Sequence, residues 1–286
     1  MTNTSIASIQ PTTRFMWRLG AASGAVSTGA TILLIPLAER TADFFAWTIA
    51  VPASAAFIGL FYLTLTVMAL LGLRQPWWAP ARAALVPAVV FVALVLVTTL
   101  LHLDKFHLFS GGLLARTVAW IWFVIYVVTV PVYLFGFWWQ RRAPGGDPPR
   151  TFPLSPWVRV ALGGLAVVLT LEGVALFVAP PLGESLWPWA LTPLTARMIG
   201  VTLISVALLA GAIIRIDDRV TGRIPAIGVL TFGVTALAVV ARYSGQVQWS
   251  RPSAWAYIAV MLALAVAALV ALSRAGSARP SAIPTS

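Results

Sequence analysis

Charged residues are scarce in this sequence. Asp, Glu, Lys and Arg make up only 9% of its 286 residues, 60% are hydrophobic, and the mean hydropathy is +0.92. A soluble domain has about 25% charged residues, so this chain has too few to cover a water-facing surface. Apolar runs of about 20 residues recur along it, and that length crosses the hydrocarbon core of a bilayer. The composition therefore predicts an all-α integral membrane protein.

Cysteine is absent, and histidine occurs only twice, as His102 and His107. The lack of cysteine excludes disulfides, thiol catalysis, iron–sulfur clusters and cysteine-based zinc sites. His102, Asp104 and His107 carry groups that ligate zinc, but their spacing is not that of a recognised site, and a loop beyond a helix end is the simpler explanation. No Ser–His–Asp set, phosphate loop or nucleotide fingerprint occurs. We expect no bound metal, no cofactor and no enzymatic activity.

Acidic residues are fewer than basic ones, and the net charge is +11. The basic residues stand one to three at a time between apolar segments, which follows the topology rule for membrane proteins and argues against nucleic-acid binding. If the N-terminus is inside, 13 of the 19 Lys and Arg residues lie on the cytoplasmic side and the remaining six lie outside. We therefore expect both termini in the cytoplasm.

A short motif occurs twice. The pattern Pro-x-[Ser/Thr]-Ala-x-x-Ile-Gly begins at Pro52 and again at Pro193, and a tryptophan precedes each copy. The motif residues are Trp47, Pro52, Ser54 and Gly59 in the first copy and Trp189, Pro193, Thr195 and Gly200 in the second. Local hydrogen bonding at a helix start explains the Ser or Thr without a ligand.

Other residues repeat at the same offset. Arg18 and Arg159, Pro52 and Pro193, and Arg82 and Arg223 are each 141 residues apart (159 − 18, 193 − 52, 223 − 82). A fourth match, from Arg116 to Trp120 and from Arg251 to Trp255, has lost six residues from the loop that holds His102 in the first half. We interpret these matches as a duplication. Four helices per copy is an even number, so the two repeats are expected to be parallel.

The apolar runs divide the chain. We expect eight transmembrane helices at about 19–37, 52–73, 83–102, 114–139, 157–180, 193–214, 224–243 and 253–273, separated by loops that include 38–51 outside and 74–82 inside, with Trp77 and Trp78 at the interface. The expected parts are a disordered tail at 1–13, a four-helix repeat at 14–139, a cytoplasmic linker at 140–154, a second four-helix repeat at 155–273 and a disordered tail at 274–286.

Gly20, Gly24 and Thr28 are spaced four apart in the first apolar run. This spacing lets helix backbones approach closely. We favour packing inside the bundle over dimerisation through these residues.

Glu172 is the one acidic residue inside a long apolar run. A charged group deep in a helix costs about 2.5–3.5 kcal/mol on insertion scales and usually finds a partner. The nearest candidate is Arg197, in the first turns of the following helix, so we expect a buried ion pair. The alternatives are a polar site for a headgroup, proton or small ligand, and a protonated Glu172 without a partner.

The stretches Phe45-Ala-Trp47-Thr-Ile-Ala-Val-Pro52-Ala-Ser54-Ala-Ala-Phe-Ile-Gly59 and Trp187-Pro-Trp189-Ala-Leu-Thr-Pro193-Leu-Thr195-Ala-Arg197-Met-Ile-Gly200 resemble pieces of uncharacterised bacterial polytopic membrane proteins. The resemblance covers about thirty residues. It implies a bacterial inner membrane but no activity and no site residue.

Three classes of function remain. The first is a non-enzymatic membrane module that binds a lipid or other amphiphile, or that joins a membrane-protein partner or a second copy of itself. The second is a secondary transporter of a small solute with a polar site at Glu172; transporters built on repeats usually have several polar groups at mid-depth. The third is an intramembrane enzyme. We favour the first class.

Overall fold

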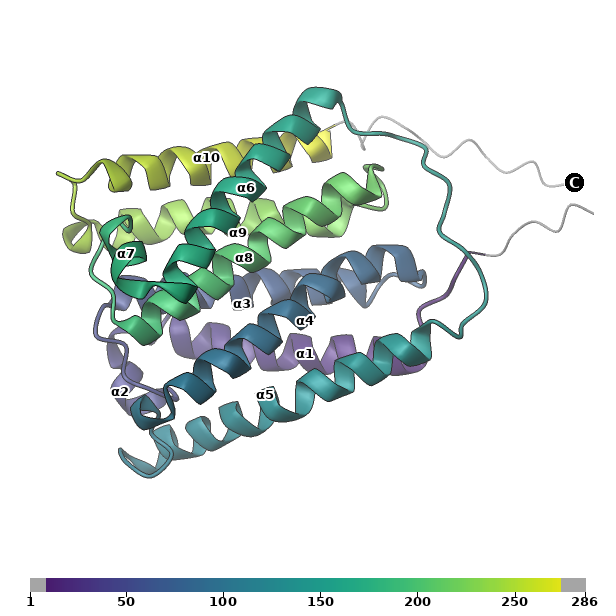
Figure 1. Cartoon of the computed structure of the whole chain (residues 1–286). Helices are drawn as coiled ribbons and strands as arrows, with labels where there is room; N and C mark the ends of the chain where they lie inside the picture. Colours follow the sequence, from purple (N-terminus) through teal and green to yellow (C-terminus); the bar gives the residue numbers. More distant parts are fainter. Residues whose placement is uncertain (1–8, 274–286) are drawn as a thin grey trace, which may run out of the picture.

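The computed structural model describes residues 9–273, and these residues are helical without strands. The long helices run along a common direction (Figure 1). They are α1 (Arg14–Leu34), α3 (Pro52–Gly72), α4 (Trp78–Leu101), α5 (Leu113–Gln140), α6 (Pro156–Val178), α8 (Pro193–Ile216), α9 (Arg223–Arg242) and α10 (Pro252–Ser273). Short helices α2 (Thr41–Phe44) and α7 (Pro180–Ser185) and three 3₁₀ turns, at Ala38–Arg40, Leu103–Lys105 and Ser244–Gln246, lie in the connections.

Seven of these helices are long and apolar enough to cross a membrane. The eighth, α1, meets the same criterion only together with residues 38–44, which bend away from it by 79°. The expectation of a polytopic helical membrane protein is therefore confirmed, with seven spans or eight.

The two ends of the bundle differ. We call the end with residues 140–156 and the start of α1 the linker end, and the end with α2 and α7 the motif end (right and left in Figure 1). Exposed tryptophans mark both ends: Trp17, Trp77, Trp138, Trp139 and Trp157 at the linker end, and Trp120, Trp249 and Trp255 at the motif end. Along α5, Trp120 and Trp138 are about 27 Å apart at 1.5 Å per residue, close to the thickness of a hydrocarbon core. Tryptophans favour both membrane interfaces.

The side of the bundle between these ends is apolar. Val160 is 75% exposed, Leu171 67% and Leu134 59%. A water-facing surface does not carry so many large apolar side chains, whereas a lipid-facing surface does. Helices α5 and α6 are the least buried of the spans, and α3 and α8 are among the most buried.

The core lies where the two halves of the chain meet. Helix α3 packs against α9, and α4 packs against α8. The contact between the halves is therefore formed by the two middle helices of each half. Helix α1 packs mainly on α3, and α6 packs mainly on α8. The fully buried Phe57, Phe61, Phe91 and Phe232 fill the interior between them.

Proline and threonine set several helix starts. Pro52 and Pro193 each occupy the first turn, where a missing N–H group costs nothing, and the Thr192 hydroxyl caps α8. The predicted loop at 74–82 is partly wrong. Helix α4 begins at Trp78 because Pro80 fits the first turn, and Trp78 is buried against Phe137 rather than at the interface.

The segment before α1 also differs from the expectation. Residues 9–13 are held in place, because Gln10 N donates to the Gly146 carbonyl, Thr12 N to that of Pro76 and Thr13 N to the Gln140 side chain. These backbone groups find partners in the linker region and in the connection between α3 and α4, so this part of the expected disordered tail is ordered. The expected disorder at 1–8 and 274–286 falls outside the described residues.

Candidate functional site

The two copies of the repeated motif meet at the motif end. Trp47 and Trp189 are both fully buried. The Trp189 indole N–H donates to the Ser54 hydroxyl at 2.8 Å, so a motif residue of the second copy binds one of the first. Thr195, which matches Ser54, instead bonds to the neighbouring Thr192 hydroxyl at 2.9 Å. Buried Trp47 has no hydrogen-bond partner for its indole N–H.

The glycines of the motif are sites of close helix approach. A Cβ atom added to Gly59 would lie 2.7 Å from Ile35 of the segment after α1, and one added to Gly200 would lie 2.5 Å from the Gly173 carbonyl oxygen on α6. Only glycine fits such distances. The Ile-Gly ending of the motif therefore serves helix packing.

Arg197 and Glu172 are not brought together. The Arg197 guanidinium donates to His102 Nε2 at 2.7 Å, and none of the ion pairs among residues 9–273 includes Glu172. The reason is the position of α8, which packs against both α6 and α4. Arg197 lies on its α4-facing side, while Glu172 lies on α6, next to the tight contact of Gly173 with Gly200. The expected ion pair is thus replaced by a contact between the halves.

The Arg197 contact requires a neutral imidazole at His102, because Nε2 must accept a hydrogen bond. Burial lowers the pKa of His102, and the nearby Arg197 charge lowers it further. Asp104 opposes this effect and Lys105 adds to it.

His107 also has a structural role. Its Nδ1 lies 3.1 Å from the Phe45 carbonyl oxygen, and its Nε2 lies 3.0 Å from the Thr48 hydroxyl. Both ring nitrogens therefore hold the segment around Trp47. Within residues 9–273 there is no cluster of three metal-ligating side chains.

Asp217 and Asp218, between α8 and α9, are largely buried although both carry a charge. Asp217 ends α8 in a left-handed conformation (φ 49°), which Asp tolerates better than most residues. Asp218 is 3% exposed, and its carboxylate accepts from the backbone N–H groups of Thr151, Phe152 and Thr221 and from the Thr151 hydroxyl. Burial alone would raise the pKa of Asp218, but these donors outweigh it and the pKa is lowered. The pair fastens the linker to the bundle.

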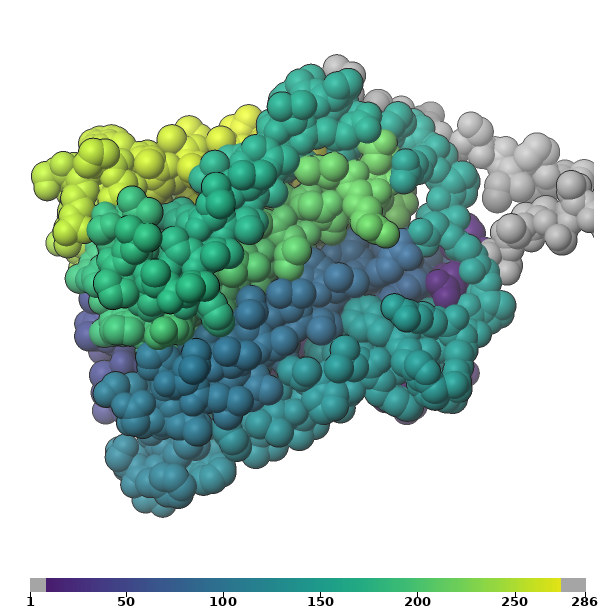
Figure 2. Space-filling view, viewed as in Figure 1, coloured from purple at the N-terminus to yellow at the C-terminus, as the bar shows by residue number. Residues whose placement is uncertain are grey.

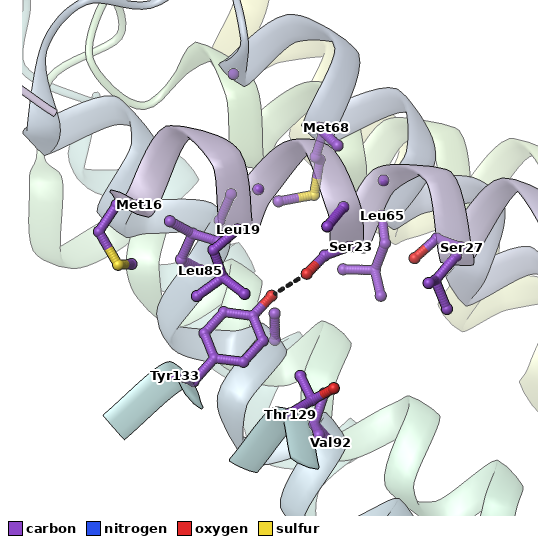
Figure 3. A pocket seen from close by; sticks show the side chains of 18 of the residues that line it. Met16, Leu19, Ser23, Ser27, Leu65, Met68, Leu85, Val92, Thr129 and Tyr133 are labelled. Carbon is purple, nitrogen blue, oxygen red and sulfur yellow. Dashed lines mark hydrogen bonds between the residues drawn. The ribbon is translucent and has the colours of Figure 1, made fainter. Parts of the chain in front are cut away.

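The first half contains a partly open cavity of ≈ 190 Å³ between α1, α3, α4 and α5, toward the linker end. Helix α1 packs tightly on α3 but lightly on α5, and small side chains such as Gly20, Ala84 and Ala88 leave the space. Figure 3 shows Leu19, Leu65, Leu85 and Val92 around it. We call this space the first-half cavity.

Several hydroxyl groups line the first-half cavity. The Tyr133 hydroxyl of α5 lies 2.9 Å from the Ser23 hydroxyl of α1 (Figure 3), and Ser27 and Thr129 lie beside them. No acidic, basic or histidine side chain lines this cavity. The arrangement suits an apolar group with a small polar end.

Comparison with protein-family models, with curated proteins and with solved structures finds no match to this chain. The resemblance of the Trp47 and Trp189 stretches to bacterial membrane proteins therefore stays a prediction, and the function is argued from geometry.

The sequence reasoning did not find the first-half cavity. Its one signal was the Gly20, Gly24 and Thr28 spacing, which we assigned to packing. Gly24 does pack closely, since an added Cβ would lie 2.7 Å from Ala69. A Cβ added to Gly20 would have no atom within 4 Å, and Gly20 lines the cavity.

Proposed function

We propose that this protein binds the apolar part of a membrane amphiphile in the first-half cavity and that it does so without catalysis. The observation that carries the proposal is the cavity itself, whose lining is apolar with hydroxyls at Ser23 and Tyr133. An apolar cavity of about 150 Å³ already holds a benzene ring, so ≈ 190 Å³ accommodates a ring or a stretch of acyl chain.

The chemistry of the lining supports binding over catalysis and transport. General acid–base catalysis needs a group that titrates near the working pH, and the cavity is lined by none. Glu172 is the candidate polar site of a transporter. It lines neither the first-half cavity nor a second, larger concave site that lies between α4, α8 and the linker. Transport of a small solute at Glu172 remains the alternative.

A photoreactive fatty acid tests the proposal. The full-length protein in lipid nanodiscs is incubated with a palmitic acid analogue that carries a mid-chain diazirine, and the adducts are mapped by peptide mass spectrometry. Adducts are expected on α1 near Ser23 and on α5 near Tyr133. Gly20→Leu, whose Cβ meets no atom within 4 Å and whose longer side chain is expected to fill part of the cavity, should reduce them about fivefold or more.

Gly29→Leu is the matched control. Gly29 lies on the same helix, is exposed and also has no atom within 4 Å of an added Cβ, but it does not line the cavity. Equal labelling of the two variants, or labelling spread evenly over the lipid-facing helices, would contradict the proposal.

The proposal includes a duplication of four parallel helices. In the first half α1 packs on α3 and α4 packs on α5; in the second half the corresponding helices α6 and α8, and α9 and α10, pack on each other in the same way. Across the halves, α3 on α9 corresponds to α4 on α8. Phe91 and Phe232, 141 residues apart (232 − 91), are both fully buried. These correspondences support two tandem repeats related by an axis along the membrane normal.

We place the linker end in the cytoplasm of a bacterial inner membrane. The distribution of Lys and Arg supports this orientation. Reporter fusions within 143–149 and at Ser286 test it: a reporter active only in the cytoplasm should be active at both positions, and a periplasmic signal at either would reverse the orientation.

A further inference from the structure

A second concave site lies at the linker end, between the two halves. Its volume is ≈ 670 Å³, and it is lined by α4, α8 and the linker. Figure 2 shows the linker passing over the ends of α4 and α8 with a hollow beneath it. We call this site the linker groove. Its lining residues are Ala79, Arg82, Ala83, Val86 and Pro87 of α4, Leu208, Gly211, Ala212, Arg215 and Ile216 of α8, and Asp147, Pro148, Arg150, Asp218 and Thr221.

Both helices present the same kind of face to the linker groove. On α4 the lining positions run from Ala79 to Pro87 at spacings of three, four, seven and eight, and on α8 they run from Leu208 to Ile216 at the same spacings. Such spacings form one stripe along a helix. Helix α4 begins at the linker end and α8 ends there, so Arg82 and Arg215 lie near the mouth and Val86 and Leu208 lie deeper.

The mouth of the groove has an excess of positive charge. Three arginines, Arg82, Arg150 and Arg215, line the groove together with two carboxylates, Asp147 and Asp218. Asp218 already accepts hydrogen bonds from four donors of the protein. Asp147 pairs with Arg82 at 2.7 Å, but their side chains are 54% and 40% exposed, and an exposed pair of this kind is weak. The Arg215 side chain forms no ion pair among residues 9–273.

Charge and depth together define the ligand. Arginine binds phosphate oxygens in a two-pronged geometry, and the linker end carries the tryptophans of a headgroup level, Trp77 and Trp138 among them. Below the arginines, Val86, Pro87 and Leu208 form an apolar floor that suits an acyl chain rather than a water-soluble ester. We propose that the linker groove binds the phosphate group of an anionic phospholipid, with Arg82 and Arg215 as donors and an acyl chain against Val86 and Leu208.

This site is separate from the first-half cavity, and neither residue set overlaps the other. Failure of amphiphile binding in the cavity therefore leaves the groove untouched, and the reverse also holds.

The chain offers a charge-matched control. Arg74 and Arg223 stand 141 residues from Arg215 and Arg82 respectively (215 − 74, 223 − 82), lie at the same end and are exposed, but they do not line the groove. Replacing either pair by Gln removes two positive charges from the same end of the protein. Only the pair in the groove should lose the specific contact.

The test measures phosphatidylglycerol binding to the full-length protein by native mass spectrometry from phosphatidylcholine nanodiscs that contain a minority of phosphatidylglycerol. Arg82→Gln/Arg215→Gln should raise the apparent Kd about tenfold, since it removes both proposed charge-assisted hydrogen bonds to the phosphate group. Arg74→Gln/Arg223→Gln should change it by less than about twofold. Arg82→Lys/Arg215→Lys keeps the charge and should fall between them.

Three outcomes overturn the assignment. Equal losses in the two Gln pairs would mean that only the net charge of this end attracts lipid. Equal binding of phosphatidylglycerol and phosphatidylcholine by the wild type would remove the phosphate as the recognised group. The third outcome is measured in pure phosphatidylcholine nanodiscs, where no phosphatidylglycerol is bound. If inorganic phosphate or glycerol phosphate raised the thermal stability of the wild type there, and the Lys pair lost this effect, the groove would be assigned to a soluble phosphate ester. If the Gln pair does not fold, the phosphatidylglycerol affinity of the Lys pair still tests the assignment.

Discussion

The two halves of the chain carry the same motif but close their helix contacts differently. In the second half, Gly173 and Gly200 face each other, and α6 lies against α8 at backbone distance. In the first half, Gly59 meets the larger Leu34 and Ile35, and α1 stands away from α5 around the first-half cavity. At the 141-residue offset, Gly173 corresponds to Ile32 (173 − 32). The closest approach is thus backbone to backbone in the second half and backbone to side chain in the first.

The largest expected effect comes from breaking the closed contact. Gly200→Ala adds a Cβ atom 2.5 Å from the Gly173 carbonyl oxygen and 3.0 Å from Phe177 N, both backbone atoms that cannot turn aside. We expect a loss of about 2 kcal/mol or more in the free energy of unfolding, measured as a lowered thermal midpoint in detergent.

Gly164→Ala is the control for that change. Gly164 is exposed on α6 with no atom within 4 Å of an added Cβ, so better helix propensity should leave stability unchanged or raise it by up to about 1 kcal/mol. If both variants were equally stable, the close contact would carry no weight in holding α6 to α8.

A smaller effect should separate the two motif tryptophans. Trp189→Phe removes the donor to the buried Ser54 hydroxyl, while Trp47→Phe removes an N–H group that has no partner. Both lose similar volume, so Trp189→Phe should be more destabilising by about 1–2 kcal/mol, the cost of an unsatisfied buried group. Thermal unfolding of the two variants and of Trp189→Phe/Ser54→Ala measures the difference. A larger loss in Trp47→Phe would contradict the assigned asymmetry.

The smallest effect concerns pH and the contact between the halves. The pKa of His102 in the folded state lies below the ordinary histidine value of about 6.5, so the folded state resists the proton that the unfolded state takes up. Stability from this site is therefore full above about pH 6.5 and is lost as the pH falls below that value through the folded pKa. Because the site is partly solvated, we expect the thermal midpoint to change by only about 1 °C. His102→Gln should remove this part of the pH dependence, and an unchanged profile would refute the role of His102.

Sequence patterns predicted the long helices well because each apolar run had to cross the bilayer. The starts of α3 and α8 at Pro52 and Pro193 were predicted to the residue, since proline in the first turn leaves little choice. Helix α4 was predicted to start too late, at about residue 83, although Pro80 fits within the first turn of a helix that begins at Trp78.

The side-chain sites were harder to predict because they depend on rotation about each helix axis. Depth along the membrane suggested that Glu172 and Arg197 meet, but it gave no information on which neighbour each residue faces. Arg197 faces His102, the residue that follows α4 and lies 95 positions earlier in the chain. The first-half cavity depends on how far α1 stands from α5, and no local pattern sets that distance.

The bond between Trp189 and Ser54 joins residues 135 positions apart. At roughly 5–20 residues per second of synthesis, Ser54 is synthesised about 7 to 27 seconds before its donor exists. During that interval the faces of α3 and α4 that later pack on α9 and α8 must be covered by lipid or by another protein. The order of synthesis therefore leaves these faces of α3 and α4 without α9 and α8 until the second half of the chain has been made.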